Sequence, residues 1–235
     1  AVGGEAGLAP VAPSSEAQSG GGGGGGRERP EVDSASDVSQ PQPGTLDRWP
    51  TADAYVVHAR EDSPQGKIRA LTKWASAFEE AHGRPPRVYV DALSADPSLV
   101  PEERLAHMPV YLSRAHRLLV LAGPGLADSL WCAVELYLWR ALGNRLEDVD
   151  VAVIPPAAHL HGAAHADEHS QALVSAFDTF HVMYAAARPV HGEAVAEVLT
   201  SVVEIASVPV FNHAVRAYLP LVRDAVRAER GAAAD

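Results

Sequence analysis

The sequence predicts an α/β protein in which helices cover both faces of a parallel β-sheet. Short runs rich in β-branched and aromatic residues alternate with amphipathic stretches of roughly 12–18 residues, which is typical of βαβ units. The run 118–122 (Leu-Leu-Val-Leu-Ala) is apolar throughout, as a strand buried on both faces requires. Right-handed crossovers then lead to a doubly wound, flavodoxin-like three-layer sandwich with strand order 2-1-3-4-5.

Five strands are predicted from the β-rich runs. The apolar runs are short, and turn residues such as Gly83, Pro85 and Pro86 separate them from the helices. The expected strands are, in chain order, 54–58, 87–91, 118–122, 149–154 and an edge strand at 181–184.

The first two helices follow from apolar residues spaced three and four apart. In the first helix, the inward stripe is expected to consist of Ile68, Leu71, Trp74, Ala75 and Phe78. The second helix begins at Pro101, a residue suited to the first helical position, and Pro109 is expected to kink or shorten it. Its inward residues are expected to be Leu105, Met108 and Leu112.

The later helices are bounded by capping and breaking residues. Asp128 or Ser129 can cap a helix that runs to about Leu142, where Gly143 and Asn144 end it. Three further helices are expected at 168–177, 193–206 and 211–227, the last interrupted at Pro220.

Composition narrows the classes of protein. The 235 residues carry a net charge of −11, and the Lys and Arg residues are scattered, which argues against nucleic-acid and anionic-membrane partners. No apolar stretch is long enough for a membrane span, and no signal-peptide pattern is visible, so a cytoplasmic protein is expected. Residues 1–48, with seven consecutive glycines, are expected to form a disordered leader. The domain is expected to span 49–229, and 230–235 to form a disordered tail.

The carboxyl ends of parallel strands form the ligand crevice of such a sheet. This rule places residues 59–63, 91–98, 123–131 and the segment from Pro155 onward on one rim. Asp91 is either a loop cap or a ligand contact. The Gly123-Pro124-Gly125 segment is a strand-to-helix turn, unless its amide groups bind a phosphate.

One carboxylate interrupts the apolar helix that begins near Ser129. Glu135 lies four residues from both Trp131 and Trp139, on the same helical face. A carboxylate among indoles is unfavourable without a partner or a task. We therefore expect Glu135 either to pair with an arginine such as Arg60 or to serve a chemical function.

At this point the chain resembles a known family, the TIR (Toll/interleukin-1 receptor) domains, in the style found in large algal and protist proteins. The segment 129–136 (Ser-Leu-Trp-Cys-Ala-Val-Glu-Leu) is similar to the family's Ser-x-Trp-Cys-x-x-Glu-Leu box. Residues 53–58 followed by 60–62, and 88–91, are similar to its first two strands. The resemblance covers about 53–154.

The resemblance implies either of two functions. Many TIR domains cleave NAD⁺, with the glutamate of the box at the nicotinamide ribose, whereas others are non-catalytic adaptors that bind TIR domains or self-associate. It implies that Glu135 is catalytic and that Trp131 forms a wall of the nicotinamide site. Arg60, Glu61 and Asp62 would lie on the pocket lip, and Asp91 is a further expected substrate contact. NAD⁺ is then a substrate, and no cofactor is expected.

The chain departs from this family in the loop 92–100, where Asp96-Pro97 replaces the usual Pro-Gly pair. This loop helps the NAD-cleaving relatives to assemble a shared site, so the departure counts against the enzyme.

Two other groups of residues are expected to be structural. His159, His161, His165 and His169 fall in an Ala-rich stretch and are expected to be solvated, although the i, i+4 spacing of the last three could hold a metal on a helix. Cys132, the only cysteine, has no evident base near it in the sequence and is expected to be buried and unreactive.

Overall fold

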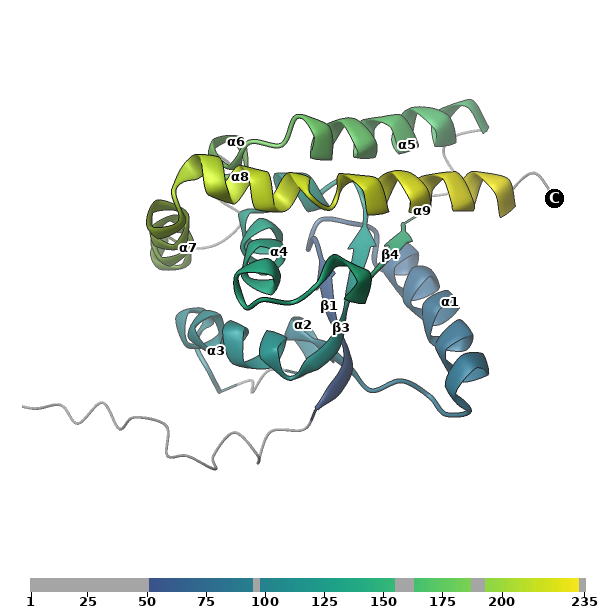
Figure 1. Ribbon diagram of the computed structural model, residues 1–235, viewed down its shortest axis with the longest axis horizontal. Coiled ribbons are helices and arrows are strands. Elements are labelled where there is room, and N and C mark those ends of the chain that lie inside the picture. Colours follow the sequence, from purple (N-terminus) through teal and green to yellow (C-terminus); the bar gives the residue numbers. More distant parts are fainter. Residues whose placement is uncertain (1–50, 95–97, 155–162, 187–192, 233–235) are drawn as a thin grey trace, which may run out of the picture. The chain divides into compact units, whose positions relative to one another are not determined.

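The computed structural model describes residues 51–94, 98–154, 163–186 and 193–232 (Figure 1). The chain divides into two units, 1–42 and 43–235, and every described residue belongs to the second unit. The expected leader lies outside the described residues, as do residues 233–235 and the atypical Asp96-Pro97 pair. The expected disordered tail is wrong over 230–232, because these residues form the last turn of a helix.

The described strands form an all-parallel sheet with the order β2-β1-β3-β4. The strands are β1 (Ala52–His58), β2 (Val88–Val90), β3 (Ala115–Ala122) and β4 (Val149–Val153). Tyr55 lies opposite Tyr89 of β2 and Leu118 of β3, so the middle of β1 is paired on both sides. The doubly wound, flavodoxin-like α/β class predicted from the sequence is confirmed.

Nine α-helices connect and cover these strands within the described ranges. They are α1 (Pro64–His82), α2 (Asp91–Ser94), α3 (Pro101–Ser113), α4 (Leu130–Ala141), α5 (Ala163–Asp178), α6 (Val182–Ala186), α7 (Glu193–Ala206), α8 (Val208–Arg216) and α9 (Leu219–Ala232). No single described helix has the length and apolar character to cross a membrane; the pair 195–206 and 208–232, bent by 95°, meets those criteria only when taken together.

Two hydrophobic cores lie on opposite faces of the sheet. Along β1, Tyr55 and Val57 belong to the larger core, whereas Ala54 and Val56 belong to the smaller one. Helix α1 covers the smaller core with Ala70, and α3 and α4 cover the other face (Figure 1). This alternation along a strand is the pattern of a sheet buried on both faces.

The expected edge strand at 181–184 is wrong, because this segment enters helix α6. Val182 and Ala185, three residues apart, are almost fully buried, whereas Met183 and Tyr184 between them are exposed. The amide of Val182 donates to Asn212 Oδ1 of α8 at 2.8 Å. This amide is therefore bonded to a side chain and not to the backbone of a neighbouring strand. A short apolar run carries too few periods to distinguish a strand from one helical turn.

Proline positions explain two further differences. Pro109 was expected to kink or shorten its helix. Helix α3 passes through Pro109 and ends at Ser113, so of these two effects the shortening is wrong. The last predicted helix was expected to be interrupted at Pro220, but the interruption falls earlier, between Arg216 and Leu219. Pro220 is the second residue of α9, a position at which a backbone N–H has no partner within the helix, so proline is tolerated there. The predicted inward residues of α3, however, are confirmed: Leu105, Met108 and Leu112 are buried.

The inward face of α1 differs from the predicted stripe. Gly66 and Ala70 are its buried residues, with Leu71 and Trp74 partly buried beside them. Ile68 is 66% exposed. Because successive residues are about 100° apart around a helix, Ile68 points roughly opposite to Ala70.

A buried carboxylate ties the start of β1 to the segment before β2. Asp53 Oδ1 and Oδ2 accept from the two terminal nitrogens of Arg84 at 2.8 and 2.7 Å, and Oδ2 also accepts from the amide of Arg87 at 2.7 Å. The hydrogen-bonded Arg84 guanidinium holds the pKa of Asp53 far below its usual 3.8. Asp53 therefore stabilises the fold above pH 3.8, and this stabilisation is lost as the pH falls below that value.

We expect Asp53→Asn to lower the free energy of unfolding at pH 7 by about 1.5–3 kcal/mol, the range for hydrogen bonds to charged groups. Urea unfolding at pH 7 and below pH 4 measures this, and the gap to the wild type should narrow at the lower pH. Glu147→Gln is the control, because its pair with Arg145 is exposed and worth little. An equal loss in both variants at pH 7 would contradict the role of Asp53.

Candidate functional site

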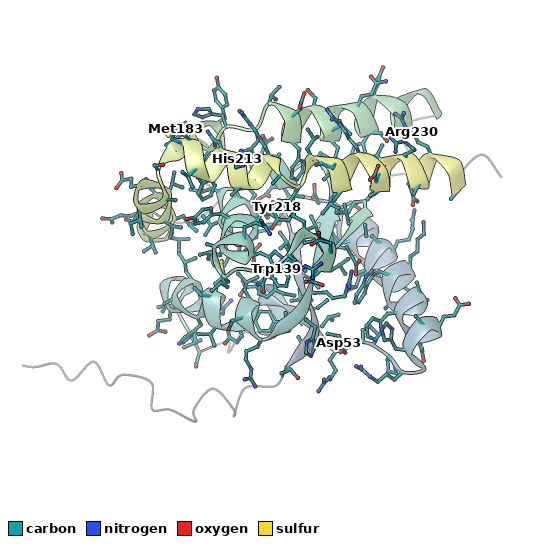
Figure 2. The ribbon with its side chains drawn as sticks, in the orientation of Figure 1. Asp53, Trp139, Met183, His213, Tyr218 and Arg230 are labelled. Carbon is teal, nitrogen blue, oxygen red and sulfur yellow. The ribbon has the colours of Figure 1, made fainter. Side chains whose placement is uncertain are left out.

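Helix α4 carries the candidate catalytic residue, and its position is tightly determined. Ser129 Oγ accepts from the amide of Cys132 at 3.3 Å and caps the helix, as predicted. Gly143 follows the helix with a φ of 85°, a conformation that suits glycine. Tyr218 lies in the turn between α8 and α9 (Figure 2). Its buried hydroxyl donates to the carbonyl of Leu136 at 2.9 Å. Capping at one end and this long-range bond hold α4 in register against the sheet.

Glu135 is the centre of the site and is only 2% exposed. Its Oε1 accepts from the Tyr55 hydroxyl at 2.7 Å and from Trp131 Nε1 at 3.0 Å. Burial raises the pKa of Glu135 to about 8; the hydrogen bond from Tyr55 opposes this rise, and the charge of Asp91 adds to it. Glu135 is therefore largely protonated at neutral pH and ionises just above it.

The expected ion pair between Glu135 and Arg60 is not present in the described structure. Arg60 is exposed, and Glu135 accepts hydrogen bonds from the uncharged donors Tyr55 and Trp131. The second indole on the predicted face, Trp139, donates instead to the carbonyl of Arg145 at 3.3 Å. Two neutral donors therefore satisfy a buried carboxyl group that needs no counter-charge while it is protonated.

Tyr55 is the site residue that sequence reasoning missed. Its ring stacks on Tyr89 of β2, with centroids 5.3 Å apart, and Tyr89 stacks in turn on Tyr111 of α3 at 4.2 Å. A tyrosine between the apolar residues Ala54 and Val56 of a buried strand was the available signal, because a buried phenol requires a hydrogen-bond partner. Asp91, which begins α2 directly after β2, is half-buried and close enough for its charge to act on both Tyr55 and Glu135.

A second buried carboxylate lies in the loop after β1. Asp62 is 4% exposed, and its Oδ1 accepts from the amide of Gly125 at 2.9 Å. Its Oδ2 is buried without a hydrogen-bond partner. Burial raises the pKa of Asp62, and the Gly125 amide opposes this rise. Asp62 is thus part of the rim, as expected, but it joins two loops instead of forming an exposed lip.

Gly123 makes this close approach possible. A Cβ atom at position 123 would lie 2.3 Å from Asp62 Oδ2 and 2.4 Å from its Cγ. The 123–125 segment is therefore the turn that the sequence predicted, with the amide of Gly125 already bound to a side chain of the same protein. Lys67 Nζ secures the facing loop through the carbonyls of Ala59 and Arg60, at 2.9 and 3.3 Å.

Arg60 and Glu61, the other two residues predicted to lie on the lip of the pocket, are exposed beside Asp62. In the described part of the rim, the cations Arg60 and Lys67 and the carboxylates Glu61 and Asp62 therefore lie on the loop after β1 and at the start of α1. The structure brings Trp131, Asp91 and Glu135 together and leaves Arg60 and Glu61 at the solvent.

Cys132 is buried, and burial raises the pKa of its thiol well above its usual value, which disfavours the reactive thiolate. His159 and His161 lie outside the described residues. The ring Nε2 of His169 lies 3.2 Å from the carbonyl of Ile154. Among the described residues, no group of three or more His, Cys, Asp or Glu side chains could hold a metal ion.

Comparison of the chain with family models and with curated proteins gave no match.

Proposed function

We propose that this α/β domain is TIR-like and that it cleaves NAD⁺ to nicotinamide and ADP-ribose, with Glu135 as the catalytic carboxylate. The observation that carries the proposal is the carboxyl group of Glu135, held beneath the rim by Tyr55 and Trp131. A carboxyl group with a pKa of about 8 is close to its ionisation point at physiological pH. Such tuning is characteristic of functional carboxyl groups.

The chemistry requires one negative charge. The bond between ribose C1′ and the nicotinamide nitrogen breaks, and its electron pair neutralises the pyridinium, so nicotinamide leaves without a proton. The ribose becomes an oxocarbenium-like cation, which ionised Glu135 would stabilise. Water then adds to C1′ and releases a proton. Because the substrate carries a positive nicotinamide ring, its binding would lower the pKa of Glu135 and favour the ionised form.

Access to Glu135 requires a local movement, because the side chain is only 2% exposed. Trp131 is the candidate for this movement: it is half-buried, and its indole nitrogen is already bonded to Glu135. Displacement of the indole would expose the carboxylate and leave an aromatic wall for the nicotinamide ring.

The same burial favours a second candidate function, a non-catalytic module that binds other TIR domains or a second copy of itself. In that case, Glu135 is a structural acid that joins α4 to β1 through Tyr55. The test is to incubate the purified full chain with NAD⁺ and to measure nicotinamide release. Release supports catalysis; no release at any pH from 6 to 9 rejects it and leaves the interaction module.

The pH dependence gives a sharper expectation. The rate constant kcat/KM for NAD⁺ should rise with pH and level off above about 8, as Glu135 of the free protein ionises. The free energy of unfolding should fall as the pH rises, whereas kcat/KM increases. Because the folded pKa lies above the unfolded value of 4.5, the free energy of unfolding should fall from about pH 4.5 to about pH 8 and then level.

Parallel urea titrations of wild type and Glu135→Gln isolate this contribution. The difference in stability between the two should change across that range, because only the wild type loses a proton at this position. A difference that stays constant from pH 5 to 9 would show that Glu135 ionises normally in the folded protein.

A further inference from the structure

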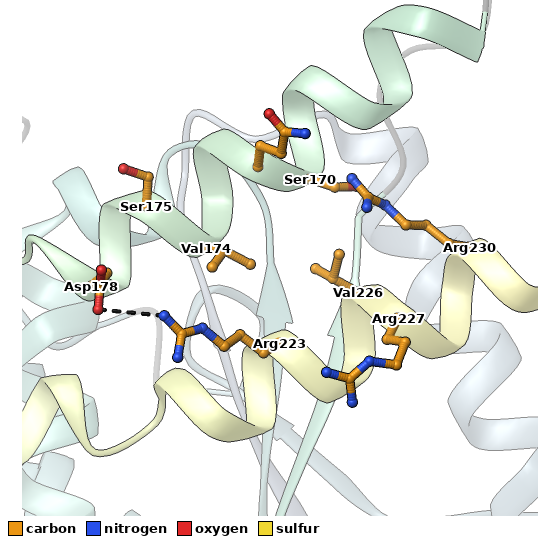
Figure 3. Close-up of a pocket in the computed structure, with 9 residues that line it drawn as sticks. Ser170, Val174, Ser175, Asp178, Arg223, Val226, Arg227 and Arg230 are labelled. Atoms are coloured by element: carbon orange, nitrogen blue, oxygen red, sulfur yellow. Dashed lines mark ion pairs between the residues drawn. The ribbon is translucent and has the colours of Figure 1, made fainter.

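A groove of about 440 Å³ lies between α5 and α9, outside the site described above. Ribbons of the two helices run side by side in Figure 1, and Figure 3 shows the side chains that line the space between them. Helix α5 contributes hydroxyl, amide and carboxylate groups from Ser170, Gln171, Ser175 and Asp178. A volume of this size is within the range of small-molecule sites.

The α9 wall of the groove is strongly cationic. Arg223, Arg227 and Arg230 line it, against the single carboxylate of Asp178. They are four and three residues apart, so they follow one face of the helix at intervals of roughly 5–6 Å. In a chain with a net charge of −11, this concentration of arginines is a local exception. The scattered distribution expected from the sequence does not hold on this face.

The ion pairs of Arg223 and Arg227 are weak enough to yield to a ligand. Arg223 lies 3.5 Å from Asp178, and both side chains are about half-exposed. Arg227 pairs with Asp224 on its own helix at 2.9 Å, with both side chains largely exposed. Exposed pairs of this kind contribute little, whereas a guanidinium group binds phosphate oxygens in a bidentate manner.

The floor of the groove is apolar. Val226 is buried and Val174 is partly buried, and their side chains lie between the polar groups of α5 and the arginines (Figure 3). An anion that fits both features carries phosphate groups at one end and a less polar body at the other. We propose that the α5–α9 groove binds a small organic diphosphate, such as a nucleoside diphosphate, through the guanidinium groups of Arg223 and Arg227.

Isothermal titration of the full chain with ADP, pyrophosphate and adenosine tests this proposal. ADP and pyrophosphate should bind, adenosine should not, and the affinity for both anions should fall as salt is added. The variant R223Q/R227Q should lose at least tenfold in affinity. Its fold should survive, because both side chains are exposed. Far-UV circular dichroism checks the fold.

The matched control is R69Q/R145Q, which removes the same charge from exposed positions on other elements. It should bind ADP like the wild type. R223Q/R227Q should also release nicotinamide from NAD⁺ at the wild-type rate, because both arginines lie outside the proposed NAD⁺ site. The proposal is overturned if neither anion binds at millimolar concentration, or if R223Q/R227Q loses no more affinity than R69Q/R145Q. It is equally overturned if R223Q/R227Q abolishes the nicotinamide release that the wild type shows.

Discussion

Glu135→Gln is expected to lower the rate of NAD⁺ cleavage by about 10²–10³-fold, the usual effect of removing one well-placed electrostatic group. Glutamine retains the volume of the side chain and an Oε1 that can accept from Tyr55 and Trp131, as Glu135 does. At pH 7 the wild-type carboxyl is largely protonated, so the substitution replaces one neutral group with another. In the unfolded wild type, however, Glu135 is ionised at pH 7, which lowers wild-type stability and has no counterpart in glutamine. The melting temperature of Glu135→Gln at pH 7 should therefore equal or exceed that of the wild type.

Nicotinamide release and melting temperature, measured on the same preparation, test both parts of this expectation. Glu204→Gln, an exposed change on α7, is the control and should leave both quantities unaltered. A folded Glu135→Gln protein with wild-type turnover would remove Glu135 from the catalytic mechanism. Wild-type turnover together with a large fall in melting temperature would assign Glu135 a structural role only.

Gly123→Ala is expected to cause the larger loss of stability, about 3 kcal/mol, at the upper end of the usual cost of overpacking. The new Cβ atom would overlap Asp62 Oδ2 at 2.3 Å, and that carboxylate is buried and bonded to Gly125. Relief of the overlap requires Asp62 to leave its position, which breaks the contact between the loops after β1 and β3. Urea unfolding measures the loss.

A double-mutant cycle tests whether the overlap with Asp62 causes this loss of stability. In an Asp62→Ala background, Gly123→Ala should cost much less, because the overlapping carboxylate is gone. Gly231→Ala is the matched control: a Cβ at position 231 meets nothing within 4 Å, so this change should be neutral or stabilising. Equal costs of Gly123→Ala with and without Asp62 would show that the strain lies elsewhere.

Local signals were sufficient to predict much of the fold. The parallel sheet followed from apolar strands separated by helices, and the start of α4 followed from Ser129, whose hydroxyl caps it. Glu135 was identifiable as a lone carboxylate in an apolar helix. Such signals operate over three or four residues along the chain, a distance within which spacing and capping determine local structure.

Only the tertiary structure determined which side chains contact one another in the site. Tyr55 and Glu135 are 80 residues apart, and Asp62 and Gly125 are 63 apart, so no local pattern links them. The arginines of α9 form a cationic groove only because α5 packs beside them. The 181–184 segment was mispredicted for the same reason, since Asn212, 30 residues from Val182, binds its amide. The sequence by itself determined the four described strands, the helices between them and the unusual carboxylate. The crossovers between strands determined the partners of this carboxylate, its burial and therefore its pKa.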